Sequence, residues 1–329
     1  MKSSFFFIII IILNLALGCS KVTVNPLAGK IICLDPGHGG TALTDSFRVG
    51  PSGEREEWIN LRVALELTKL LEDDGAQVFL TRKSDSSVAL KDRALIAEQN
   101  NADVFVSIHH NAAADTSINF PIIYFHGNVS ENRSSVKLGE ILAENLRQKL
   151  FDETTPVSVV SDHAIFPQSG TAVLRHSYGI PGVIGEASFF TNPSEELRLK
   201  DEEYNQKEAE AYYNTLKEYF AEPRDEILPK YSKLKLHPYN VMQESERMNE
   251  IAKHWKADYL KGKDLAELEN QDSLRKALFL ISRSIRSLPD SWVARKGHLL
   301  RSEIFMKLGQ KAASDTARMR AEEFYSSID

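Results

Sequence analysis

The sequence predicts an α/β protein in which residues 30–221 form a three-layer α/β/α sheet domain and an all-α region follows. Two observations support this fold class. Short apolar segments typical of strands alternate with segments of helical periodicity as far as residue 220, as in a largely parallel sheet covered by helices. Beyond that point the apolar residues follow helical spacing only. At 329 residues the chain is long enough for two such units.

The first 19 residues indicate a secretory signal, because Lys2 precedes an apolar run from Phe5 to Leu13 that is too short to span a bilayer comfortably. Cys19 follows a small residue, as at a bacterial lipoprotein cleavage site, although Ala16 stands where leucine is usual. We therefore expect export to the periplasm or cell envelope and a lipid on Cys19 that anchors the protein to a membrane. Ordinary cleavage and an uncleaved anchor are the alternatives, and residues 20–29 form a tether.

With Cys19 lipidated, Cys33 is the one free cysteine that remains, and a lone cysteine cannot form an intramolecular disulfide. The domain must then be stable through its core alone. Cys33 lies between Ile32 and Leu34 on the first predicted strand and is expected to be a small buried hydrophobe.

The sheet domain is predicted element by element from its periodicity. A helix after the loop at residues 41–53 has apolar residues at helical spacing and ends near Gly75, a typical helix-terminating glycine. A second helix covers Leu90 to Gln99, and two later helices are centred near residues 144 and 213. The predicted strands are Lys30 to Leu34, Gln77 to Thr81, Ala102 to Ile108, Pro121 to His126 and Gly182 to Gly185.

Pro223 and Pro229 mark a linker at residues 222–230, and residues 231–329 are predicted to be helical. From Lys230 onward, 19 Lys and Arg stand against 14 Asp and Glu, a net charge of +5, whereas the rest of the chain carries −11. This difference supports two modules. The helical pattern resembles a degenerate tetratricopeptide-type array, and an unrelated helical bundle is the alternative.

Candidate site residues follow the predicted strands. His38 lies in the segment Leu34-Asp35-Pro36-Gly37-His38-Gly39-Gly40, and the acidic residues Glu54, Glu56 and Glu57 follow it. Ser107-Ile108-His109-His110-Asn111 comes after another strand, and Gly185-Glu186 ends a third. The carboxyl ends of parallel strands are where such sheets place their sites. Two imidazoles and a carboxylate suit a catalytic zinc ion, which takes three protein ligands and keeps one position open.

Together these segments resemble the zinc-dependent N-acetylmuramoyl-L-alanine amidases (amidase type 3) over roughly residues 30–220. The order of the motifs is specific: Asp-Pro-Gly-His-Gly-Gly, a glutamate that opens a helix, Thr81-Arg82, Ser-Ile-His-x-Asn, and Glu186 ahead of Phe190-Thr191-Asn192-Pro193. The resemblance implies hydrolysis of the amide bond between N-acetylmuramic acid and L-alanine of the peptidoglycan stem peptide, for cell-wall remodelling or daughter-cell separation.

The resemblance implies one Zn²⁺ ion held by His38, Glu56 and His109. Glu56 is selected because the family's glutamate lies five residues before a helix leucine, here Leu61. The family usually has lysine at the next position, where this chain has glutamate. Glu54 and Glu57 therefore remain alternative ligands.

His110 is the alternative to His109, although successive side chains of an extended segment point to opposite faces. Asn111 either orients a ligand or has a structural role. By resemblance, Glu186 is the general base, which takes a proton from the attacking water and passes it to the leaving amine. Arg175 either assists Glu186, binds a substrate carboxylate or forms a structural salt bridge.

Five other basic residues of the domain match no ligand motif. We expect surface or hydrogen-bonded positions for its remaining histidines, with a substrate contact as the alternative for His163, and fold or helix contacts for the two arginines. These residues are His126, His163, His176, Arg82 and Arg93.

Other functions are less compatible with the sequence. Another zinc peptidase acting on wall peptides would share the ligands, and a catalytically silent peptidoglycan-binding scaffold would be expected to lack one. The chain has no Gly-x-Ser-x-Gly nucleophile segment. Nucleic acid is not an expected partner, because the chain is exported and its basic residues are not clustered with aromatics. The C-terminal helices are expected either to pack on the enzyme as a helical appendage or to dock a regulatory or wall-complex protein.

Overall fold

The computed structural model describes residues 25–41 and 48–328. The predicted signal segment, Cys19 and half of the tether lie outside the described residues. Among those described, no helix is both long enough and apolar enough to cross a membrane.

A mixed sheet of six strands forms the centre of the molecule, in the order β2-β1-β3-β6-β4-β5. Strands β1, β2, β3 and β6 are parallel, whereas β4 runs antiparallel to β6 and parallel to β5. The carboxyl ends of β4 and β5 therefore point to the opposite end of the sheet from the carboxyl ends of the other four strands. The strands are β1 (Ile31–Pro36), β2 (Gln77–Leu80), β3 (Val104–Asn111), β4 (Ile122–Phe125), β5 (Ser158–Ser161) and β6 (Gly182–Phe189).

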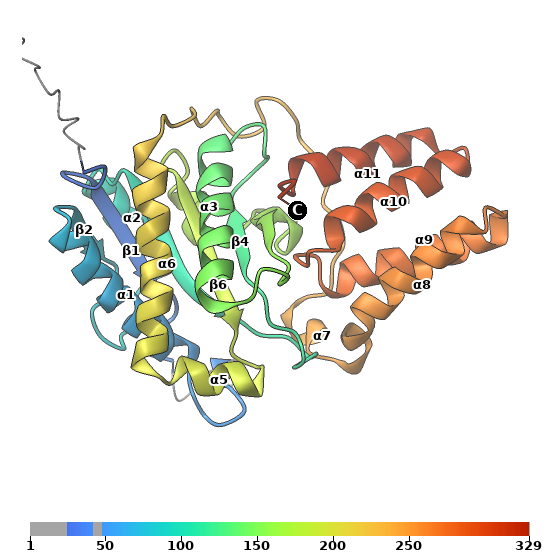
Figure 1. The fold of residues 1–329 in the computed structure, drawn as a ribbon. Coiled ribbons are helices and arrows are strands. Elements are labelled where there is room, and N and C mark those ends of the chain that lie inside the picture. Colours follow the sequence, from blue (N-terminus) through green and yellow to red (C-terminus); the bar gives the residue numbers. More distant parts are fainter. Residues whose placement is uncertain (1–24, 42–47, 329) are drawn as a thin grey trace, which may run out of the picture.

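Helices α1 (Glu56–Asp73), α6 (Glu202–Ala221) and α3 (Arg133–Leu150) cover one face of the sheet side by side (Figure 1). Alternate strand residues such as Ile32, Leu34 and Val106 point to this face and pack against these helices in one apolar core. Because both faces of the central strands are covered, those strands are nearly continuously apolar. Helix α5 (Pro193–Leu199) connects β6 to α6.

The opposite face is covered by α2 (Leu90–Gln99), α4 (Ala172–His176) and part of the C-terminal helical region. Cys33 is fully buried in this second core, which confirms the expected packing role, and burial raises the pKa of its thiol to about 12. Trp255, Leu288 and Tyr325 from the helical region belong to the same core. The hydrophobic core therefore runs from the sheet into the helical region.

The helical region consists of two short segments and two consecutive helix pairs, which project from the β5 side of the sheet (Figure 1). A separate apolar cluster around Ala277, Ile281 and Ile285 holds these pairs together. Its elements are α7 (Glu244–Arg247), the 3-10 helix η3 (Glu250–His254), α8 (Trp255–Glu267), α9 (Gln271–Ser287), α10 (Ala294–Lys307) and α11 (Lys311–Glu323).

The chain after α11 returns to the sheet edge at β5. The amide of Ser161 donates to the carbonyl of Phe324 at 2.7 Å, and the amide of Ser326 donates to that of Val159 at 2.9 Å. These bonds cover the outer edge of the sheet, which would otherwise expose unpaired backbone groups.

The α/β sheet with flanking helices and the helical C-terminal part are as predicted, with two differences in detail. β3 and β6 continue past their predicted ends at Ile108 and Gly185, so His109 and Glu186 lie within strands. β5 and the short helices α4 and α5 were not predicted, because segments of four to seven residues are too short to show a period. Residues 223–229 form neither helix nor strand, and the domain boundary there stays a prediction.

Candidate active site

The turn after β1 places His38 above the carboxyl ends of β1 and β3. His38 adopts φ +57°, a left-handed conformation that is uncommon outside glycine and marks a constrained position. Gly37 is required beside it, because a Cβ atom there would lie 2.2 Å from the His109 ring. At Gly39, with φ +110°, a Cβ atom would lie 2.5 Å from the carbonyl oxygen of Ser86.

Two buried arginines hold this turn. Arg82 donates to the carbonyls of Pro36 and Gly37 at 2.8 Å each, and Arg93 donates to the carbonyl of His38 at 2.6 Å. The fold contacts expected for both arginines are therefore contacts with the loop that carries His38.

Asp35 connects the turn to neighbouring strands. Its buried carboxylate accepts hydrogen bonds from Thr81 at 2.6 Å, Ser107 at 2.7 Å and Arg93 at 2.8 Å. Burial opposes ionisation of this group, but Arg93 and the two hydroxyls lower the pKa of Asp35 below its usual value. An ionised, fully hydrogen-bonded carboxylate thus fixes the base of the His38 turn.

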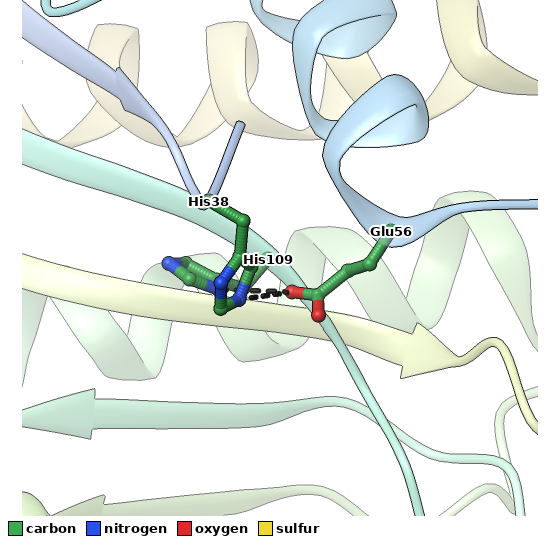
Figure 2. Close-up of side chains that lie close together, drawn as sticks. All are labelled: His38, Glu56 and His109. Carbon is green, nitrogen blue, oxygen red and sulfur yellow. Dashed lines mark hydrogen bonds and ion pairs between the residues drawn. The ribbon is translucent and has the colours of Figure 1, made fainter. Parts of the chain in front are cut away.

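The structure brings His38, Glu56 and His109 together (Figure 2). Oε1 of Glu56 lies 3.1 Å from Nε2 of His38 and 2.9 Å from Nδ1 of His109. Glu56 is the first residue of α1, so its position depends on where that helix begins. The three side chains come from the β1 turn, α1 and β3, elements that are far apart in the sequence.

These residues fit a zinc ion in two respects: the types of their donor atoms, and a buried carboxylate oxygen that has no hydrogen-bond partner among the described residues. Burial opposes ionisation of Glu56, but the two imidazoles lower its pKa well below the usual value. Its Oε2 atom is buried and accepts no hydrogen bond from the described residues. This atom forms an ion pair with Nη1 of Arg48, at 3.6 Å. Burial lowers the pKa of His38, which favours the neutral ring that ligates metals. Two imidazoles and one carboxylate are a known donor set of catalytic zinc sites.

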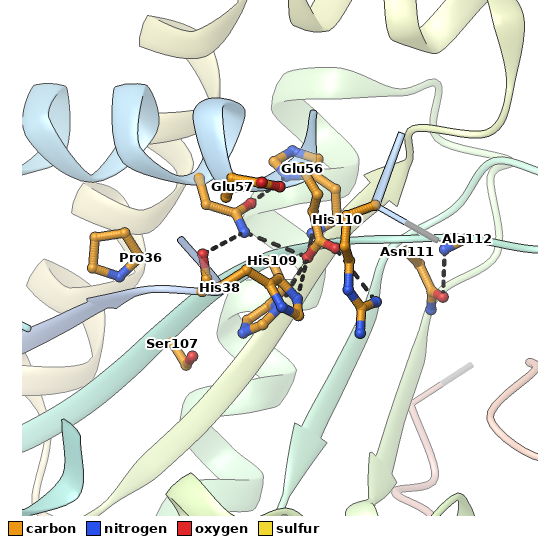
Figure 3. A network of polar contacts seen from close by, with 12 residues as sticks. Pro36, His38, Glu56, Glu57, Ser107, His109, His110, Asn111 and Ala112 are labelled. Carbon is orange, nitrogen blue, oxygen red and sulfur yellow. Dashed lines mark hydrogen bonds and ion pairs between the residues drawn. The ribbon is translucent and has the colours of Figure 1, made fainter. Parts of the chain in front are cut away.

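The alternative acidic ligands are engaged elsewhere. Glu54 accepts a hydrogen bond from Arg62 at 2.8 Å, and Glu57 accepts one from Arg55 at 2.7 Å. Figure 3 shows Glu56 and Glu57 leaving the start of α1 next to one another.

His110 also has its own partners, although it lines the same cavity. Its two ring nitrogens lie 2.9 Å from Oδ1 of Asn60 and 3.0 Å from Oε2 of Glu208. Both nitrogens are therefore occupied within the protein, whereas His109 is directed at Glu56.

Glu186 lies directly across from His109 in the β3–β6 register. Burial raises the pKa of Glu186 to about 7, against the influence of His109. Its Oε2 atom is buried without a hydrogen-bond partner among the described residues. A carboxylate with a pKa near neutrality can both accept and return a proton.

This geometry can be compared with known proteins. Residues 32–218 match the family model described as N-acetylmuramoyl-L-alanine amidase. The chain belongs to this family. The match includes His38, Glu56, His109 and Glu186 and ends before the helical region.

Relatives named as amidases are similar over the same part of the chain. A probable cell wall amidase LytH from Staphylococcus epidermidis is 33% identical over 206 residues, which cover 61% of this chain and 62% of LytH. The germination-specific N-acetylmuramoyl-L-alanine amidase of Bacillus subtilis is 30% identical over 214 residues, covering 61% of this chain and 84% of that protein. The chain thus spans less than two thirds of the length of LytH.

Two solved structures have the same fold. The amidase AmiC2 of Nostoc punctiforme is 29% identical with a TM-score of 0.51, and the match covers 59% of this chain and 99% of that one. The CwlD amidase of Clostridioides difficile, solved in complex with the GerS lipoprotein, gives the same four values.

The other residues of the amidase domain considered from sequence lie apart from the His38 cluster or at its edge. Arg175 donates to the carbonyls of Ser169 and Gly170 at 3.2 Å each and is not among the residues that line the cavity. Asn111 lines the cavity, and its side chain accepts from the amide of Ala112 at 2.8 Å. His176 is exposed at the end of α4.

The cavity that contains His38, Glu56, His109 and Glu186 has a volume of about 170 Å³ and includes one wall from the helical region. This wall consists of Met242, Gln243, Arg247 and Met248. Arg247 pairs with the buried Asp290 at 3.3 Å. No motif marks these residues, and only their proximity in the fold reveals them.

Proposed function

We propose that this protein hydrolyses the amide bond between N-acetylmuramic acid and L-alanine in peptidoglycan. The observation that carries the proposal is the His38–Glu56–His109 cluster, which shares one cavity with Glu186 in a fold of the amidase family. The geometry supplies a metal site and an unpaired carboxylate side by side, the two parts that a metal-assisted amide hydrolase needs.

Zinc is the cofactor that we propose for the cluster, as one ion held by His38, Glu56 and His109. When bound, it would supply Lewis acidity, which activates water and stabilises negative charge on the amide oxygen. The protein contributes the ligand geometry. Arg82 and Arg93 hold the His38 turn, and the start of α1 fixes the position of Glu56.

Glu186 is the proton carrier in this proposal. Its buried carboxylate can take a proton from the attacking water and deliver it to the amine of L-alanine as the C–N bond breaks. The raised pKa of Glu186 suits both steps near neutral pH.

The test is digestion of purified peptidoglycan by residues 20–329, with and without a chelator, followed by mass spectrometry of the new ends. We expect free L-alanine amino termini on intact stem peptides, lost on chelation and restored by zinc. Glu186→Ala should abolish the product. Glu66→Gln is the matched control, since Glu66 forms an exposed pair with Lys69 on the surface of α1.

The other outcomes are distinct. New ends within the stem peptide would replace the proposal with another zinc peptidase. Binding to peptidoglycan without any cleavage at neutral pH, with zinc bound, would indicate a scaffold without catalytic activity.

We further propose that residues 1–19 direct export and that a lipid on Cys19 anchors the protein in the cell envelope. The supporting features are the apolar run and the cysteine that follows it. Intact-mass measurement of protein from its native membrane fraction should show a diacylglyceryl cysteine at residue 19. An unmodified mature terminus would overturn the anchor.

A protein partner for the helical region is proposed on two grounds. Leu268 and Phe279 are 61% and 62% exposed and offer apolar surface to a partner. The CwlD relative was solved with a lipoprotein bound. We expect Phe279→Ser to change the protein's cellular distribution with unchanged activity in vitro, and an unchanged distribution would remove the ground for this partner.

A further inference from the structure

A second cluster of two imidazoles and a carboxylate lies away from the catalytic residues. His126 follows β4, and Asp162 and His163 follow β5. Because β4 is antiparallel to β6, with Ile122 opposite Glu186, His126 lies toward the end of the sheet that is remote from Glu186. All three side chains are buried.

The donor atoms of this cluster are close enough for one ion. Nδ1 of His126 lies 2.9 Å from Oδ2 of Asp162, the same separation as between His109 and Glu56 in the catalytic cluster. The ring centroids of His126 and His163 are 5.1 Å apart, and each of the three residues offers a donor atom within 4.8 Å of the others.

The ligand side chains are oriented by further hydrogen bonds, as is usual around metal ions. Oδ2 of Asp162 accepts from the amide of Thr171 at 2.7 Å and from its hydroxyl at 2.8 Å. Burial lowers the pKa of His163, which favours the neutral ring.

The cluster also has an access path. His163 lines a cavity of about 460 Å³ between the loop after β5 and the segment that leads into the helical region. Tyr231, His237 and Phe324 line the same cavity. An ion bound by the three ligands can therefore take a water molecule from the cavity as its fourth ligand.

We propose that His126, Asp162 and His163 form a second, structural site for a divalent transition-metal ion of the Zn²⁺ type. Bound there, the ion would connect the ends of β4 and β5. Lys230 is positively charged and close enough to act electrostatically on Asp162 and His163. This positive charge opposes the binding of a cation at the second site. The inference does not depend on the proposed amidase activity.

The test is the zinc content of residues 20–329, measured by inductively coupled plasma mass spectrometry after loading and removal of free zinc. We expect two ions per chain in the wild type, one in His38→Ala, one in His163→Ala and none in the double variant. His176→Ala is the matched control and should keep two, because His176 is an exposed histidine of the same domain. Lys230→Met should tighten zinc binding at the second site, because it removes this positive charge.

A wild-type content of one ion, lost entirely in His38→Ala, would overturn the second site. Unchanged content in His163→Ala would do the same. If His163→Ala fails to fold, titration of the metal-free wild type with Co²⁺ decides the question, because visible absorption should saturate at two equivalents and not at one. Amidase assays of the same samples are read separately, so a failure of the catalytic proposal does not affect this result.

Discussion

The two histidine–carboxylate clusters use the same donor types, but their surroundings differ. In the catalytic cluster, Oε2 of Glu56 and Oε2 of Glu186 are buried without hydrogen-bond partners among the described residues. In the second cluster, the carboxylate of Asp162 is satisfied by Thr171 and His126. A buried polar atom without a hydrogen-bond partner is costly and is often a position for chemistry or a ligand. The contrast supports the proposals of a reactive site and a structural one.

The largest effect is expected from removing a ligand of the catalytic cluster. His109→Ala should reduce peptidoglycan hydrolysis to background and lower the zinc content by one ion per chain, because two ligands hold a zinc ion poorly. His163→Ala should also lose one ion but keep its activity. Equal loss of activity in both variants would remove the distinction between the clusters.

Glu186→Gln separates chemistry from metal binding. The amide of glutamine cannot carry the proton, so kcat should fall by about 10²–10⁴-fold, the usual contribution of a general acid–base group. Zinc content should stay at the wild-type value. A loss of zinc would instead make Glu186 a ligand, and Glu66→Gln again provides the exposed control on α1.

The support of the His38 turn should have an intermediate effect. Arg93 donates to both Asp35 and the carbonyl of His38, and lysine cannot reproduce both contacts. Arg93→Lys should lower kcat or zinc affinity by about 10–100-fold, as removal of outer-shell partners does. Arg147→Lys is the control, because Arg147 makes its ion pair on the surface of α3. Equal effects of the two substitutions would show that the turn needs no such support.

Much of the fold was predictable because the central strands are continuously apolar and the helices keep their period. The strand at Ser158–Ser161 was missed, since four residues with serine at both ends show no pattern. Without this strand, the cluster of His126, Asp162 and His163 could not be predicted from the sequence. Asp162 meets His126 only because β5 pairs with β4, a contact that sequence spacing does not reveal.

In the candidate site too, some residues could be predicted from the sequence and others only from the fold. His38, Glu56 and His109 were selected by motif, and the structure brings them together. Their support by Arg82 and Arg93 was not anticipated, because both arginines lie far from the ligands in sequence. The cavity wall from the helical region follows from packing alone.

In the second cluster, Asp162→Asn should affect stability and leave catalysis unchanged. Asparagine can still accept a hydrogen bond from the hydroxyl of Thr171, but it lacks the negative charge that pairs with His126. In the presence of a chelator, we expect the free energy of unfolding in urea to fall by about 1–3 kcal/mol, with unchanged kcat after zinc is restored. Asp152→Asn is the matched control, since Asp152 accepts from the amide and hydroxyl of Thr154 on the surface.

The smallest expected effect is on the pH dependence of stability, through Asp35 at the base of the His38 turn. Because the pKa of Asp35 is lower in the folded protein than its usual 3.8, its ionisation stabilises the fold fully above that value. This stabilisation is lost as the pH falls through the folded-state pKa. The stability difference between the wild type and Asp35→Asn should therefore be constant from pH 7 to about 5 and narrow below about 4. A difference independent of pH would mean that Asp35 acts through hydrogen bonds alone, and that the charge of Arg93 contributes nothing to fixing the turn.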